Sequence, residues 1–205
     1  MRTKRTASVL AAGALLLGLA LPARAATSQV SMTKSHTFDP DPVAITLGDT
    51  VQWTNTSSFQ QHTATQNAGF FDTGVVDDGQ SKSKVFKWAG TFPYYCIFHG
   101  GPGFGMRGKI NVPARWATPG EQHVGDVQRI RIATEMAPAP LAFDVQMRKT
   151  GDATWSPYKQ KIKNAIVKFT PTAAGEYQFR SRVHRLSNNK VSGWSPAAFV
   201  EILPA

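Results

Sequence analysis

The chain has 205 residues, 23 basic and 13 acidic side chains, and a formal net charge of +10 at pH 7. Its single cysteine excludes an internal disulfide framework. The basic residues are dispersed rather than gathered in one patch, so the charge does not indicate a nucleic-acid-binding protein. The length accommodates two small domains behind a short leader.

The first 25 residues have the pattern of a secretory signal peptide. Basic side chains at positions 2, 4 and 5 precede an apolar stretch at 7–21, and Ala23-Arg24-Ala25 has the small residues of a cleavage site. The apolar stretch is short for a membrane span, so we expect cleavage after Ala25 and no stable membrane insertion. The predicted location is extracytoplasmic, in the cell envelope or outside the cell.

After this leader, the sequence consists of short alternating runs that end at Gly, Pro, Asn or Asp. This pattern predicts an all-β protein. Residues 113–123 contain two prolines and a glycine and mark a change in charge, so we expect them to be a linker. They separate two predicted β-sandwiches, residues 26–112 and residues 124–205. The first carries six basic and six acidic side chains, whereas residues 113–205 carry thirteen and seven, an excess of +6.

The first predicted sandwich contains one thiol, two imidazoles and one thioether that can meet at a metal. His99 follows Cys96 by three residues, Met106 lies beyond a glycine-rich loop, and His62 lies on a polar loop upstream. A soft thiolate, two imidazoles and a weak axial thioether form the donor set of a type 1 blue copper site. Metal ligation also protects a free thiol in an oxidising compartment. The sequence therefore predicts one type 1 copper per chain.

Two segments carry a resemblance to a known family. The run Gly90 to Ile110, which includes Tyr95-Cys96-Ile97-Phe98-His99, resembles the ligand loop of plastocyanin-like cupredoxins. The run Phe38 to Asn55 is similar to the early strand pair of that family, joined by a Gly-Asp turn. The resemblance covers residues 28–112 and implies a Greek-key β-sandwich.

The resemblance also implies the ligands. The three strong ligands would be His62, Cys96 and His99, and the axial ligand would be Met106. Six residues lie between His99 and Met106, more than is usual in the family. The resemblance further implies that Thr63, beside the first ligand, ties the two ligand loops together by hydrogen bonds.

The second predicted sandwich shows clear alternation of apolar and polar residues. The segments 169–182 and 192–196 resemble a fibronectin type III domain, a smaller immunoglobulin-like sandwich, and Tyr177 takes the position of its tyrosine corner. We expect this half to act as a tether or docking surface. Because it carries the whole mature charge excess, we also expect it to bind anionic envelope polymers weakly.

The remaining histidines receive no role from the sequence. His184 lies on the arginine-bearing face of its predicted strand and is expected at the surface. His123 falls in the linker and His36 precedes a proline-bounded turn, and neither has a second donor at metal-binding spacing. With five histidines in all, the chain lacks the extra pairs that copper oxidases use for a second copper centre, so we expect no enzymatic activity.

Together these features predict an exported one-electron carrier that serves envelope or extracellular redox proteins. His99 is expected to be the partly exposed ligand, with Phe98, Pro102 and Phe104 as a small apolar docking surface. Two alternatives fit the same sequence. One is an extracytoplasmic copper carrier or buffer without a dedicated electron-transfer role, and the other is an adhesion or cell-wall-binding module.

Overall fold

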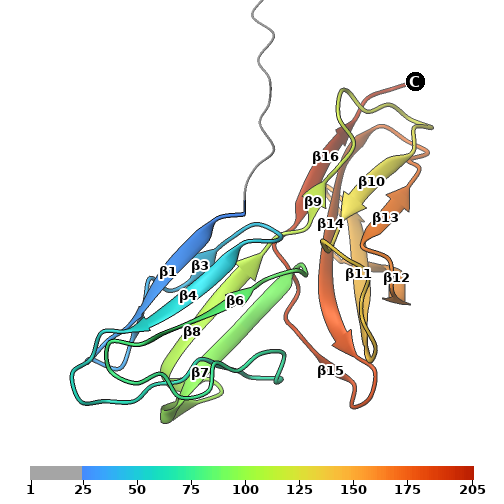
Figure 1. The fold of residues 1–205 in the computed structure, drawn as a ribbon. Helices are drawn as coiled ribbons and strands as arrows, with labels where there is room; N and C mark the ends of the chain where they lie inside the picture. Colours follow the sequence, from blue (N-terminus) through green and yellow to red (C-terminus); the bar gives the residue numbers. More distant parts are fainter. Residues whose placement is uncertain (1–24) are drawn as a thin grey trace, which may run out of the picture.

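The computed structural model describes residues 25–205 and contains only strands and loops over that range (Figure 1). The prediction of an all-β protein is confirmed. The predicted signal peptide, apart from its last residue, lies outside the described residues. Within the described range, no helix is long and apolar enough to cross a membrane.

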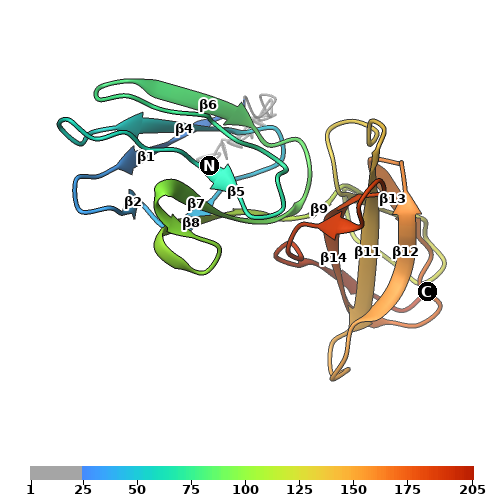
Figure 2. The same ribbon diagram turned by 90° about the horizontal axis from the view of Figure 1, so that it is seen from below.

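Two four-stranded sheets form the first lobe, which we define as residues 26–112, and lie as two layers in Figure 2. One sheet has the order β2-β1-β4-β6, with β1 (Thr27–Met32), β2 (Phe38–Asp39), β4 (Thr50–Asn55) and β6 (Ser81–Val85). The other has the order β3-β8-β7-β5, with β3 (Val43–Ala44), β5 (Thr65–Gln66), β7 (Gly90–Gly101) and β8 (Phe104–Val112). The first lobe is thus a β-sandwich.

Aromatic side chains fill the space between these two sheets. Trp53 is fully buried on β4, where buried and half-buried residues alternate. Its ring centroid lies 5.4 Å from that of Phe71 and 5.6 Å from that of Tyr94 on β7, in tilted and edge-to-face arrangements. Such pairs add specific ring contacts to a large buried apolar area. This packing fixes β7, the strand that carries Cys96, against the opposite sheet.

The second lobe, residues 113–205, also has two sheets. One has the order β13-β10-β9, with β9 (Arg115–Trp116), β10 (Gln128–Arg131) and β13 (Ile166–Phe169). In the other, β11 pairs with β12 and β14, and β14 pairs with β15 and β16; the strands are β11 (Leu141–Lys149), β12 (Ser156–Ile162), β14 (Gly175–Arg185), β15 (Lys190–Val191) and β16 (Ala198–Ile202). The segment expected to be a linker therefore contains β9, which is part of a sheet.

Tyr177 makes the hydrogen bond that its predicted corner position implies. Its hydroxyl donates to the carbonyl oxygen of Ala173 at 2.9 Å. The ring packs 4.9 Å from that of Phe169, on the other sheet of the second lobe. This contact ties the loop before β14 to the lobe's core.

The two lobes pack directly against each other. Thr91 on β7 exchanges backbone hydrogen bonds with Gly193, and its hydroxyl donates to the carbonyl oxygen of Trp194 at 2.8 Å. The guanidinium of Arg185 lies 5.0 Å from the ring centroid of Phe70 and donates to the Gly69 carbonyl oxygen at 2.7 Å. These contacts give the lobes a shared surface that a simple tether would not have.

Candidate metal centre

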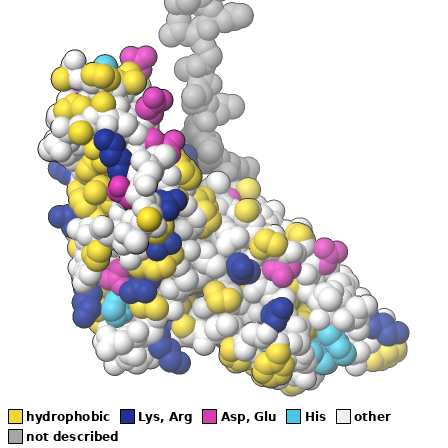
Figure 3. Space-filling model, turned by 180° about the vertical axis from the view of Figure 1, so that it is seen from behind, with side chains coloured by type: hydrophobic (Ala, Val, Ile, Leu, Met, Phe, Trp, Pro, Cys, Tyr) yellow, Lys and Arg dark blue, Asp and Glu magenta, His cyan; other side chains and the backbone are white. Residues whose placement is uncertain are grey.

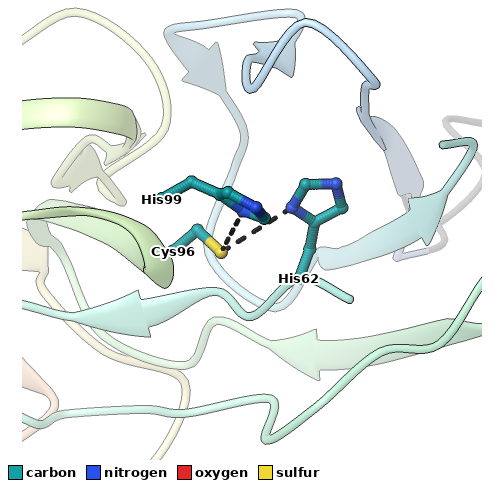
Figure 4. A group of neighbouring side chains, drawn as sticks. All are labelled: His62, Cys96 and His99. Atoms are coloured by element: carbon teal, nitrogen blue, oxygen red, sulfur yellow. Dashed lines mark hydrogen bonds between the residues drawn. The ribbon is translucent and has the colours of Figure 1, made fainter. Parts of the chain in front are cut away.

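His62, Cys96 and His99 bring one ligand atom each to within 4.8 Å of the others (Figure 4). The Cys96 Sγ lies 3.4 Å from Nδ1 of His99 and 3.7 Å from Nδ1 of His62. Cys96 and His62 are fully buried, whereas His99 is half-buried. Three of the four predicted ligands therefore meet at one point, with a nitrogen of each imidazole directed at the sulfur.

An irregularity in β7 allows Cys96 and His99 to meet. In a regular strand, residues three apart point to opposite faces of the sheet. Here β7 pairs regularly with β8 as far as Tyr95, opposite Arg107, and pairing resumes only at Gly100, opposite Gly105. Such a bulge redirects side chains without breaking the strand.

Gly105 is required on the facing strand at this bulge. Its φ of +65° lies in the left-handed region, and a Cβ at this position would overlap the His99 carbonyl oxygen. The close approach of β8 to the backbone of a predicted ligand therefore depends on a glycine.

Thr63 links the two ligand segments, as the resemblance implied. Its backbone N–H donates to the Cys96 Sγ at 3.4 Å, and its side-chain hydroxyl accepts from the N–H of Ile97 at 3.1 Å. The first bond fixes the position of the sulfur, and the second fixes the backbone that follows it. Thr63 thus holds the thiol and the His62 loop at a fixed separation.

A buried chain of hydrogen bonds sets the tautomer of His62. Asn55 Nδ2 donates to the carbonyl oxygens of Gln60 and Val76, which leaves its Oδ1 to accept from the Ser57 hydroxyl at 2.6 Å. The Ser57 oxygen, 2.9 Å from Nε2 of His62, must then accept a hydrogen bond from the N–H at that nitrogen. Nδ1 is left with a free lone pair toward the thiol, as a metal ligand requires.

Both clustered imidazoles are held in their neutral form. Burial lowers the pKa of His62 to about 4, and repulsion by His99 and His36 adds to the effect. Burial also lowers the pKa of His99, again with a contribution from His36. Neutral imidazole is the form that binds a metal, so the site is ready to do so at neutral pH.

Met106, the fourth predicted ligand, is buried near the start of β8. It directly precedes Arg107, the β8 partner of Tyr95, at the point where regular pairing of β7 with β8 is interrupted. The thioether is therefore buried in the core, and its residue lies at the same interruption in strand pairing that contains Cys96 and His99.

Sequence reasoning missed three residues of this region. Asn55 and Ser57 act on His62 through hydrogen bonds, and nothing in the polar run 54–58 distinguishes them from ordinary turn residues. His36, which received no role, lies on the loop between β1 and β2, and its ring centroid is 4.0 Å from that of His99. The sequence offers His36 no second donor at metal-binding spacing, and it is the fold that brings its ring beside His99.

His184 was also misplaced by the sequence. It was expected at the surface, but it is buried, with Nδ1 3.1 Å from Oδ2 of Asp144 and Nε2 3.3 Å from Oδ1 of Asn189. Asn189 belongs to the turn between β14 and β15, which covers this end of the strand. The alternation along β14 therefore predicted correctly which face of the sheet His184 lies on. It did not reveal that the turn between β14 and β15 lies against that face.

Comparison with known proteins supports the resemblance. No family model matches the chain. The plastocyanin of Scenedesmus fuscus is 33% identical over 85 residues, which cover 37% of this chain and 85% of that protein. The chloroplastic plastocyanin of Tetradesmus obliquus is 32% identical over 123 residues, which cover 54% of this chain and 81% of that protein.

Solved structures with similarity to the chain include a purple cupredoxin from Nitrosopumilus maritimus, with 26% identity, a TM-score of 0.37, and coverage of 42% of this chain and 98% of that one. A Cu(I) form of an amicyanin variant has 26% identity, a TM-score of 0.36, and coverage of 45% and 86%.

The cluster fits the metal that its donor set predicts. A buried thiol, two neutral imidazoles with Nδ1 directed at it and a buried thioether suit a type 1 copper, which shuttles between Cu(I) and Cu(II). The identity with the two plastocyanins extends over more than four-fifths of their length. Through its first lobe, the chain belongs to the plastocyanin-like cupredoxins and has a type 1 copper as its cofactor.

Proposed function

We propose that the protein is an exported carrier of single electrons. One copper would be held by His62, Cys96, His99 and Met106. The bound metal supplies the one-electron Cu(I)/Cu(II) couple. The observation that supports this role most directly is the preset cluster, in which two imidazole nitrogens already lie 3.4 and 3.7 Å from a buried thiol.

The surrounding residues suit electron transfer because they resist movement. Thr63 fixes the sulfur, and Ser57 fixes the tautomer and ring of His62. A site with rigid donors changes little between two oxidation states, so little reorganisation accompanies each transfer. His99 is the only half-buried member of the cluster, so we infer that electrons would pass through it.

A partner would dock on apolar side chains around His99. Phe59 is 99% exposed, Phe104 64% and Phe98 48%. Phe59, Phe98 and His99 line a shallow groove together with Gln60 and Gln61. A small apolar patch of this kind favours a weak complex that dissociates quickly, as repeated electron exchange requires. We propose that the partners are other exported redox proteins.

Copper titration of the chain without its first 25 residues tests this function. We expect an intense blue absorption that saturates at one copper per chain, together with fast electron self-exchange. A pale complex would contradict the type 1 site. A blue complex with slow self-exchange would favour the alternative role of an extracytoplasmic copper carrier or buffer.

A second candidate function belongs to the second lobe. Five side chains stack in the order Arg148, Trp155, Arg180, Trp194, Arg182, with each guanidinium 4.3–5.0 Å from the neighbouring ring centroid. We call this row the arginine–tryptophan ladder. On the face seen in Figure 3, basic side chains are more numerous on the second lobe than on the first. The ladder favours weak binding of anionic envelope polymers.

The charges of the ladder are only partly balanced. Arg182 pairs with Asp144 at 3.0 Å, whereas Arg148 and Arg180 donate to the neutral amide oxygens of Gln178 and Gln146. Within residues 25–205, no carboxylate lies within 4.0 Å of the Arg148 or Arg180 guanidinium. Guanidinium groups fixed in this way present their N–H edges to phosphate or carboxylate oxygens.

Retention on immobilised polyphosphate tests the ladder. We expect retention at low salt that fades as added NaCl screens the charges. Arg180→Gln should weaken it more than Lys168→Gln, a matched change at an exposed lysine outside the ladder. Equal weakening by both variants would mean that net charge alone is responsible, and no retention at low salt would overturn the proposal.

A further inference from the structure

His36 lies flat against His99, the half-buried member of the metal cluster. The two ring centroids are 4.0 Å apart and the ring planes differ by 15°, so one face of each imidazole contacts the other. His62 lies 4.8 Å from His99 and Phe98 lies 6.3 Å from it, both at steep angles. His99 is therefore enclosed by three rings, of which His36 is the one in parallel contact.

The loop between β1 and β2 holds His36 in this place. The backbone N–H of His36 donates to the Thr33 carbonyl oxygen at 3.0 Å, and the N–H of Thr33 donates to the Thr37 carbonyl oxygen at 2.9 Å. The hydroxyls of Thr33 and Thr37 lie 2.6 Å apart. His36 has a φ of +57°, in the left-handed region that histidine adopts more readily than most residues. The turn therefore carries an imidazole ring at a position whose positive φ would also suit asparagine or glycine.

The two clustered histidines differ in what orients them. Nε2 of His62 is hydrogen-bonded to Ser57 in the interior. Among the described residues, no group hydrogen-bonds to Nε2 of His99, and the only hydrogen-bond partner of this side chain is the Cys96 sulfur, at Nδ1. The ring of His99 is therefore oriented by contact rather than by a second hydrogen bond, and the parallel contact comes from His36.

We propose that His36 is a positioning residue for His99. By covering one face of the ring, it holds Nδ1 toward the thiol and restricts rotation of the imidazole toward solvent. This inference rests on the proposed copper site, since its consequence is slower loss of the metal through the exposed side. Aromatic contacts of this size change rates modestly, so removing the ring should speed metal release about two- to tenfold.

Two substitutions at this position separate stacking from loop structure. His36→Asn keeps a residue that tolerates positive φ but removes the ring, whereas His36→Phe keeps a ring. His123→Asn is the control, because that imidazole lies on the second lobe, bonded to the Pro204 carbonyl oxygen. Thermal unfolding of each metal-free variant checks that the fold is retained.

The first readout is the NMR signal of the His99 ring in the metal-free protein. We expect His36→Asn to broaden or average this signal, and His36→Phe and His123→Asn to leave it sharp. The second is transfer of Cu(I) to a chelator, which should be two- to tenfold faster in His36→Asn and close to wild type in the other two.

An unchanged His99 signal and an unchanged transfer rate in His36→Asn would overturn the inference. Equal effects of His36→Asn and His36→Phe would mean that the loop, not the ring, is responsible, and would overturn it too. Failure of the copper site itself is recognised separately, because the wild-type protein would then give no blue complex while the metal-free NMR comparison could still be made.

Discussion

The two lobes each bury a histidine, but in opposite electrostatic settings. In the first lobe, His62 is surrounded by the neutral groups of Ser57 and Asn55, and its Nδ1 lone pair is free. In the second, His184 and Arg182 both contact the buried carboxylate of Asp144, so that Nδ1 of His184 is occupied. A metal can bind where lone pairs converge that no protein cation already uses, as at His62, Cys96 and His99 but not at Asp144. The comparison explains why the first lobe has the metal centre and the second has a closed ion-pair network.

Among the changes that test this difference between the lobes, removal of the thiol should have the largest effect. We expect Cys96→Ser to lose the blue absorption completely and to lose most of the affinity for Cu(I), because a hydroxyl is neither soft nor readily ionised. Absorption spectroscopy and competition with a Cu(I) chelator measure the two effects. A blue Cys96→Ser complex would place the metal elsewhere.

Removing the carboxylate of the second lobe should act on stability alone. Asp144→Asn leaves Arg182 and His184 without their charged acceptor, and we expect the free energy of unfolding to fall by about 2–3 kcal/mol. Urea denaturation measures this loss. Copper stoichiometry and colour should stay the same, and a changed copper site would show that the two lobes are coupled more closely than their chemistry suggests.

Acidification should affect the lobes in different pH ranges. Burial, with repulsion from His99 and His36, lowers the pKa of His62 from 6.5 to about 4, so the unfolded chain takes up a proton that the folded one refuses. The metal-free protein should therefore lose stability as the pH falls from about 6.5 to about 4. In His62→Gln this slope should be shallower, with the part due to the lowered pKa of His99 remaining.

The contribution of Asp144 should disappear at lower pH. Burial alone would raise the pKa of its carboxyl, but hydrogen bonds from the Lys161 N–H, Arg182 and His184 outweigh it and lower the pKa below 3.8. Its stabilisation is present above 3.8 and is lost as the pH falls through the lowered folded value. The difference between wild type and Asp144→Asn, measured by urea denaturation, should thus vanish only in that acidic range.

The smallest predicted effect concerns the axial position. Met106→Leu should leave the blue colour largely intact and raise the reduction potential, because a weak donor is lost while three strong ones remain. Met147→Leu, at a half-buried methionine of the second lobe, is the matched control and should change neither. Voltammetry measures the reduction potential of each variant. Complete loss of copper from Met106→Leu would contradict the division into strong and weak ligands.

Sequence reasoning succeeded where the chemistry is local. Cys96 and His99 lie within one short segment, and a thiol with no disulfide partner already points to a metal. Alternation along β4 and β14 predicts the buried faces, because side chains of a strand point alternately to its two sides.

It failed where contacts join distant segments. His36 reaches His99 through a turn of the opposite sheet, and Asp144 meets His184 across paired strands. The bulge in β7 was also not predictable, since spacing alone does not reveal where pairing is interrupted. Only the assembled sheets bring these residues together.

The segment between His99 and Met106 folds back on itself as a small hairpin, in which Gly100 pairs with Gly105 and Gly101 with Phe104. We therefore expect that its length can be changed without disturbing the metal centre, but only in steps of two. Deleting Gly101 together with Phe104 would shorten both arms equally and leave Met106 facing inward. Deleting one residue alone would turn Met106 to the opposite face of β8 unless the turn absorbed the change. We therefore expect that this hairpin can be exchanged for loops that differ from it by an even number of residues.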